Sequence, residues 1–221
     1  MARTRDSVRA VDVYDAGERR PSQGQQGNIE ISDRTDDEVD VLYEPPEEYP
    51  YPDQVISRGT FEYTKDGILG TSSASGSFQL RPGSEMFVVR MSAGSAQLGE
   101  VVDALDEKLD EELDIIIDVH RDLADSSNAI WKLLDDATWI GSVVIRFRGQ
   151  RKSLAELREE RGIGLEDVAH ESSLLEADFI LETPWGDPVN VIYEEGKIEV
   201  ATGDDTTHEY VLQLLETARS R

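Results

Sequence analysis

Acidic and histidine side chains alternate in Asp118-x-His120-x-Asp122, at the end of the short apolar run 114–119 (DIIIDV). Alternate residues of an extended chain point to one side, so these side chains could face one divalent metal ion. Carboxylate oxygens and imidazole nitrogens are common ligands of such ions, and a bound metal can activate water for hydrolysis. A metal-dependent hydrolase using Asp118, His120 and Asp122 is therefore one hypothesis for this chain.

The Asp-x-His pattern resembles the opening motif of the calcineurin-like metallophosphoesterases, over three residues. That family also carries a Gly-Asp motif and a Gly-Asn-His motif further along the chain. Gly-Asp occurs here at 186–187 and 203–204, where turn chemistry already explains it, and no Gly-Asn-His is present. The other interpretation places His120 and its flanking acids on a solvated surface or at a helix start. No other cofactor motif is visible, so we expect no cofactor.

A basic cluster is the second candidate site. Six cations fall within residues 146–161, against three glutamates in the same window: Arg146, Arg148, Arg151, Lys152, Arg158 and Arg161. Guanidinium groups bind phosphate and carboxylate in a planar fork, so the cluster could hold an anion, a nucleic-acid backbone or an acidic protein partner. Alternatively, these cations neutralise acids of the same chain. Trp185, in the turn sequence TPWGDP, is a further candidate for partner contact.

The cluster stands out because the chain is strongly acidic. It has 47 Asp and Glu against 22 Lys and Arg, a formal net charge of −25 over 221 residues, and only five of the cations are Lys. Such a charge destabilises a compact state at low ionic strength, whereas molar salt shortens the Debye length to about 3 Å and screens the repulsion. The composition is typical of a halophile that keeps molar salt in its cytoplasm.

Composition also excludes several classes of protein. The chain has no cysteine, which excludes disulfide frameworks, thiol catalysis and iron–sulfur clusters, and only three histidines. No apolar stretch approaches the roughly 20 residues of a membrane span, and the first 20 residues lack the apolar core of a signal peptide. We therefore expect a soluble cytoplasmic protein, or one held within an assembled particle, without membrane contact.

The elements that position these residues indicate an α+β fold, with a mixed or antiparallel sheet and packed helices. Residues 1–53 combine a Gln/Gly-rich linker with a proline-rich acidic stretch, so we expect an extended arm with short strands at 29–31 and 39–43. Residues 54–221 are expected to form a single domain, with a possible sub-boundary near residue 150.

Within that domain, apolar residues recur every three or four positions over 95–113, which predicts an acidic amphipathic helix. The β-branched run 114–119 favours a strand, although the helical spacing could also continue through it. With a helix at 127–137 and a strand at 142–148, a β-α-β-α-β order follows from residue 86. Strands at 178–182, 189–193 and 197–201, then a last helix, form a β-β-β-α unit.

Residues 153–170 predict two short helices. Ser153-x-x-Glu156 is a capping box and Gly162 a stop, and a second helix is expected over 165–170. This arrangement resembles the first two helices of a helix-turn-helix and overlaps the basic cluster. Glu166 and Asp167, however, would meet DNA phosphates at the start of the recognition helix and repel them.

Three classes of function follow. We favour a non-enzymatic interaction or structural protein, with a protein partner or its own homo-oligomer, held in an assembly such as a virus particle through the N-terminal arm. The second is a nucleic-acid-associated regulator using the cluster 146–152. The third is the hydrolase at Asp118 and His120.

Overall fold

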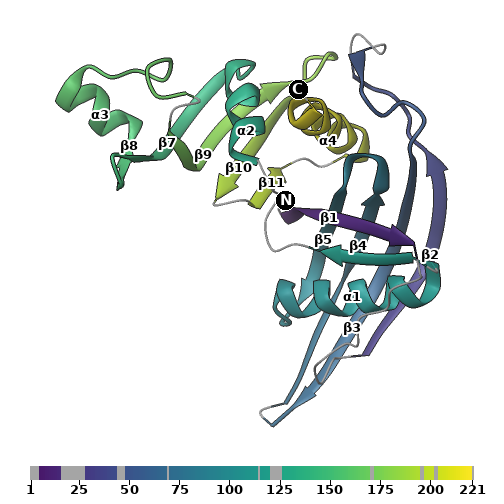
Figure 1. The fold of residues 1–221 in the computed structure, drawn as a ribbon. Helices are drawn as coiled ribbons and strands as arrows, with labels where there is room; N and C mark the ends of the chain where they lie inside the picture. Colours follow the sequence, from purple (N-terminus) through teal and green to yellow (C-terminus); the bar gives the residue numbers. More distant parts are fainter. Residues whose placement is uncertain are drawn as a thin grey trace. The chain divides into compact units, whose positions relative to one another are not determined.

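The computed structural model describes residues 5–15, 28–43, 48–68, 70–113, 115–119, 126–169, 172–194, 197–201 and 204–220. These residues form two compact units (Figure 1). The N-unit consists of Arg5–Val39 and Asp53–Leu123, and the C-unit mainly of Asp40–Pro52 and Ala124–Arg221. Residues 40–52 are therefore grouped with the C-terminal part of the chain.

The N-unit is an antiparallel six-stranded sheet with one helix. Its strand order is β2-β3-β4-β5-β1-β6, and α1 lies across one face of the sheet (Figure 1). The elements are β1 (Arg5–Asp15), β2 (Asn28–Glu38), β3 (Val55–Gly67), β4 (Gly70–Arg81), the 3-10 helix η2 (Pro82–Ser84), β5 (Met86–Gly94), α1 (Leu98–Leu113) and β6 (Ile115–Val119).

The core of the N-unit forms between α1 and the sheet because their apolar periodicities match. Phe61 and Tyr63 alternate with exposed residues along β3, so both face the same side. On α1, the buried positions include Val102, Leu105 and Leu109, spaced for one helix face. These residues share one apolar cluster, which confirms the amphipathic helix expected from the sequence.

The strand predicted at 114–119 is confirmed: β6 pairs with β1 in the register Val11↔Val119. Three consecutive isoleucines explain the choice, since β-branched residues favour extended chain over helix. The expected order β-α-β-α-β is also present from residue 86. Its strands do not share one sheet, however: β5 and β6 belong to the N-unit with β1 between them, whereas the next strand belongs to the C-unit.

Two described segments of the expected N-terminal arm, residues 5–15 and 28–38, are strands of this sheet. β1 is an inner strand that pairs with both β5 and β6. Val8 and Val11 are both buried although three positions apart, so both faces of the strand are covered. The short strand expected at 29–31 lies within β2, whereas residues 39–43 form no strand.

The C-unit is an antiparallel five-stranded sheet with three helices, in the strand order β11-β10-β9-β7-β8. Its elements are α2 (Ser126–Asp135), β7 (Trp139–Phe147), β8 (Gln150–Ser153), α3 (Leu154–Arg161), β9 (Ser173–Glu182), β10 (Pro188–Glu194), β11 (Lys197–Ala201) and α4 (Asp205–Ser220). The predicted helix at 127–137 and the β-β-β-α unit are therefore confirmed, and the fold is α+β.

Helix α4 is buried along most of its length. Apolar residues such as Val211, Leu212 and Leu215 pack into the core. Polar residues are buried too, including Gln213 and Glu216, both fully inaccessible. Buried polar groups require hydrogen-bond partners, and residues 40–49 supply them: Leu42 N donates to Gln213 Oε1 over 2.7 Å, and the Tyr49 hydroxyl donates to Glu216.

Candidate partner-binding surface

The basic cluster is built on the β7–β8 hairpin. Arg146 pairs with Arg151 and Phe147 with Gln150, which leaves Arg148 and Gly149 as a two-residue turn. Both turn residues have positive φ, 51° and 80°, as a type I′ turn requires. The strand expected over 142–148 therefore ends at Phe147, and Arg148 lies at the hairpin tip, not on the strand face of Arg146.

Replacing Gly149 by Ala is expected to destabilise the C-unit by about 1 kcal/mol, because an L side chain disfavours this φ. No atom lies within 4 Å of the added Cβ, so the cost is conformational and not steric. Gly164→Ala is the matched control, since Gly164 has no positive φ and its Cβ would make only ordinary contact with Asp167. Urea unfolding should separate the two variants, and equal midpoints would contradict the turn assignment.

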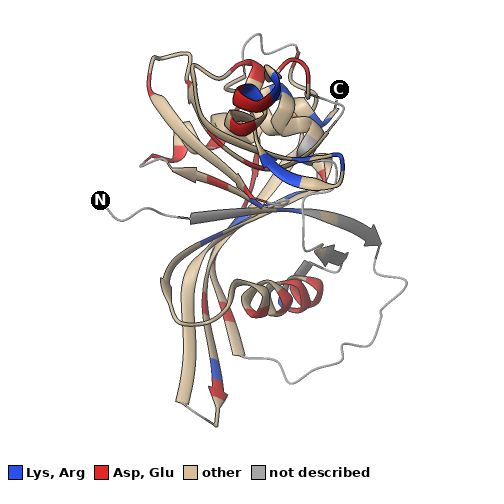
Figure 2. Cartoon of the chain, turned by 90° about the vertical axis from the view of Figure 1, so that its left-hand side faces the viewer, with Lys and Arg blue, Asp and Glu red and all other residues tan. Residues whose placement is uncertain are grey.

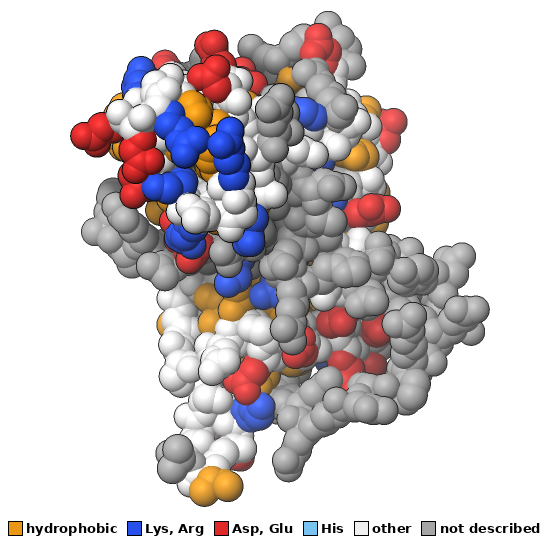
Figure 3. Space-filling view, turned by 60° about the vertical axis from the view of Figure 1, so that its left-hand side comes forward, with side chains coloured by type: hydrophobic (Ala, Val, Ile, Leu, Met, Phe, Trp, Pro, Cys, Tyr) orange, Lys and Arg blue, Asp and Glu red, His pale blue; other side chains and the backbone are white. Residues whose placement is uncertain are grey.

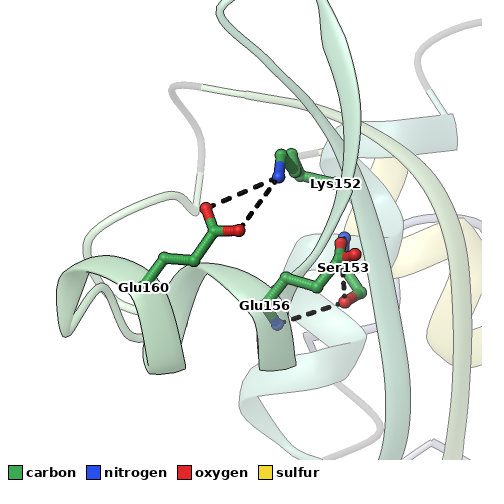
Figure 4. Close-up of polar contacts among 4 residues, drawn as sticks. All are labelled: Lys152, Ser153, Glu156 and Glu160. Atoms are coloured by element: carbon green, nitrogen blue, oxygen red, sulfur yellow. Dashed lines mark hydrogen bonds and ion pairs between the residues drawn. The ribbon is translucent and has the colours of Figure 1, made fainter.

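Helix α3 continues from the hairpin, and its start is fixed locally. Ser153 Oγ accepts from Glu156 N over 3.2 Å, and the Glu156 carboxylate accepts from Ser153 N over 2.9 Å (Figure 4). This capping box confirms the sequence prediction. The Glu156 carboxylate accepts hydrogen bonds from the Ser153 backbone N–H and from its hydroxyl, and these bonds hold the pKa of Glu156 below its usual value. Gly162 ends the helix with a φ of 69°.

Two of the six cations are neutralised within the surface. Arg151 forms an ion pair with Glu176 of β9. Lys152 Nζ lies 3.3 and 3.5 Å from the two carboxylate oxygens of Glu160, so this ion pair joins β8 to α3 (Figure 4). For these two cations, the alternative of internal pairing is therefore the one realised in the structure.

The other four cations are exposed, and none of them pairs with a carboxylate in the described part of the chain: Arg146, Arg148, Arg158 and Arg161. The guanidinium carbons of Arg148 and Arg161 lie 5.2 and 5.8 Å from the ring centroid of half-buried Phe147. Figure 3 shows the blue side chains gathered over this part of the C-unit. We call these four residues the arginine end.

Trp185 is not part of the arginine end. It lies in the turn between β9 and β10, and the antiparallel register places that turn at the opposite end of the sheet from the β7–β8 hairpin. The side chain is 45% exposed and packs edge-on against Tyr210, with ring centroids 5.6 Å apart. Trp185 therefore keeps its place as a separate candidate contact residue.

Trp139 is a half-exposed residue that the sequence analysis did not select. It is 52% exposed at the Trp185 end of the sheet. Its ring lies over Gly141 of the same strand, where an added Cβ would meet the indole at 2.3 Å. A glycine two residues after a strand tryptophan is the signal that could have indicated this packing, because alternate strand residues share a face.

The second helix expected over 165–170 does not form over residues 165–169, the part of this segment that the structure describes. Residues 165–169 make turns, with Val168 N and Ala169 N both bonded to the Leu165 carbonyl. The Asp167 carboxylate accepts a hydrogen bond from Gly164 N over 2.7 Å, which stabilises the chain at this turn. The helix-turn-helix hypothesis therefore lacks its recognition helix.

The metal-site hypothesis falls mostly outside the described residues. Asp118 lies in β6 with its backbone paired to Asp12, whereas His120 and Asp122 are not described. Among the described side chains, no three His, Cys, Asp or Glu residues gather in a way that could hold a metal ion. The proposed ligands Asp118, His120 and Asp122 remain a prediction.

Comparison with known proteins adds no functional information. No family model, no curated protein and no solved structure matches this chain. In the described part of the chain, none of the helices is both long enough and apolar enough to span a membrane. The arginine end is an exposed positive surface in a chain of net charge −25, which makes it the candidate site.

Proposed function

We propose that this chain is a non-enzymatic interaction protein that docks onto an acidic protein surface through its arginine end. One observation carries the proposal: four exposed arginines without a carboxylate partner in the described chain lie at one end of the C-unit, in a protein of net charge −25. The chain has more than twice as many acids as cations, yet the fold brings no described carboxylate into an ion pair with any of these four arginines. Cations left exposed in such a chain favour contact with an anion from outside.

The chemistry of arginine supports a carboxylate-bearing partner. A guanidinium group binds a carboxylate through two parallel hydrogen bonds and is weakly hydrated, so such a contact retains value at short range in molar salt. Phe147 adds apolar surface, and its contacts with Arg148 and Arg161 restrict both side chains before docking. Less side-chain entropy is then lost when a partner binds.

Nucleic acid fits this surface less well. Binding a phosphate backbone depends on a broad cationic footprint and weakens steeply with salt. Four free cations on a body of net charge −25 provide a small footprint, and the described residues 165–169 form turns where a recognition helix was expected. The regulator hypothesis therefore becomes one outcome of the experiment below.

In this proposal the arginine end makes the docking contact, in place of the N-terminal arm that the sequence analysis favoured. Residues 5–15 and 28–38 are strands of the N-unit sheet, in which β1 pairs on both sides and the edge strand β2 pairs with β3. They are therefore poor candidates for an anchor that orders only on a neighbour. Membership of a larger assembly, a virus particle included, stays within the proposal, with the arginine end as the contact.

Reversing the charge of Arg146 and Arg158 is expected to remove most of the bound partner. Arg146→Glu should fold normally, because it places a carboxylate opposite Arg151 in the register. The tagged protein, this variant, Arg158→Glu and the double variant would be purified from native extract at about 2 M KCl. Quantitative mass spectrometry should show an acidic partner reduced about tenfold in the double variant.

Lys197→Glu is the matched control, since Lys197 is an exposed cation of the same unit on the far edge strand. Partners retained equally by the double variant and the control would refute the proposal. Oligonucleotides of single- and double-stranded DNA form a second arm. Retention of DNA in high salt that is lost with the double variant would favour the regulator instead.

A further inference from the structure

Helix α1 presents the opposite charge to the arginine end. Its 16 residues contain seven acids and one lysine. Figure 2 shows the positions of the acidic residues, in red, along the ribbon of this helix, and its apolar stripe is buried against the sheet of the N-unit. The helix therefore exposes a strongly anionic face.

Some of these acids already have cationic partners. Lys65 Nζ lies 2.6 Å from Glu100 Oε1, and that hydrogen bond holds the pKa of Glu100 below its usual value. Lys108 lies 3.4 and 3.5 Å from Glu111 and Glu112. Asp103 is exposed and Glu107 half-exposed, and neither pairs with a cation in the described chain.

The unpaired charges on the two helices have matching spacings. Asp103 and Glu107 are four residues apart on α1, and Arg158 and Arg161 are three apart on α3. Each pair therefore occupies neighbouring turns of one helix face, about 5–6 Å apart. Two helices lying side by side could join both acids to both arginines at once.

We propose that the acidic surface bound by the arginine end is helix α1 of a second copy of this chain. This inference rests on the proposed function and names its partner. The two surfaces differ, so the contact is head-to-tail: it leaves α1 of one copy and the arginine end of the other available to further copies. Repetition of the contact produces a ring or a filament, which is an assembly built from this chain alone.

Salt determines when such a contact can form. Two bodies of net charge −25 repel each other over about 10 Å in 0.1 M salt. Near 1 M the Debye length falls to about 3 Å, which suppresses that long-range repulsion. The attraction between a carboxylate and a guanidinium group in direct contact is screened much less. We therefore expect association at molar KCl and its loss when the salt is diluted, the reverse of an ordinary ionic complex.

Reciprocal charge reversal tests the inference. One variant carries Arg158→Glu with Arg161→Glu, and the other Asp103→Arg with Glu107→Arg. Each alone should be monomeric by sedimentation velocity at about 100 µM protein and about 2 M KCl, with self-association weakened about tenfold or more. Mixing the two should restore assembly, because each reversed surface then meets a complementary one. A single chain with all four substitutions should also assemble.

Two single charge reversals outside the proposed contact are the controls. Lys197→Glu and Glu38→Lys change exposed charges elsewhere and should leave the assembly intact. Melting curves check folding, and Arg158→Gln with Arg161→Gln replaces the reversed pair if that variant is unstable. A wild-type monomer at every concentration, or a mixture that stays monomeric, overturns the inference. If the Arg146→Glu, Arg158→Glu variant still loses a co-purifying partner, the proposed function survives with a different partner.

Discussion

Replacing Gln213 by Leu is expected to destabilise the C-unit by about 3 kcal/mol, since it removes four hydrogen bonds from a buried site. Gln213 Oε1 accepts from Leu42 N and Tyr43 N over 2.7 and 3.0 Å. Its Nε2 donates to the Asp40 carbonyl and to Glu209 over 2.7 and 3.0 Å. All donors and acceptors of the amide are used, so leucine leaves several partners unsatisfied.

The measurement can be confined to one unit, because all three tryptophans, Trp131, Trp139 and Trp185, lie in the C-unit. Tryptophan fluorescence during urea unfolding in molar KCl therefore reports on that unit. Gln150→Leu is the matched control: Gln150 is exposed, and its replacement should change stability by no more than about 0.5 kcal/mol. Equal midpoints for the two variants would contradict the role assigned to Gln213.

Diluting the salt from about 3 M to about 0.1 M KCl is expected to lower the melting temperature by about 10 °C or more. Carboxylates are close together throughout the described chain. Glu30 lies directly opposite Glu62 in the sheet, and α1 carries seven acids. At low salt these like charges repel in the folded state more than in the expanded unfolded chain, so folding loses free energy.

Circular dichroism melting over a KCl series checks this expectation. Screening should act mainly below about 1 M, where the Debye length changes most, whereas salt effects on apolar hydration keep rising at higher concentration. A melting temperature unchanged over the whole range would refute the halophile interpretation. The salt-dependent assembly of α1 with the arginine end would then lose its physical basis.

Near-neighbour patterns in the sequence were sufficient for most elements of the fold. The apolar spacing of α1, the isoleucines of β6 and the capping box of α3 each act within a few residues of the chain. The strand meander before α4 likewise follows from alternation and turn residues. Of the arginine end, the sequence supplied the residue types and their excess of positive charge.

Tertiary structure decided which elements share a sheet and which polar groups are buried. β1 is a sheet strand because it pairs with β5 and β6, about 80 and about 100 positions away in the chain, and its valines alone gave too little signal among charged neighbours. The amide of Gln213 is buried at low cost because residues 40–43 return to it across 170 positions of chain.

The sequence by itself determined that this protein is acidic, α+β and locally basic over residues 146–161. Only the three-dimensional arrangement decided that Arg151 and Lys152 are paired, that Arg148 is at a hairpin tip, and that four arginines stay exposed. The physical reason is range: helix periodicity and capping act between chain neighbours, whereas ion pairing depends on which distant carboxylate the fold brings within about 4 Å.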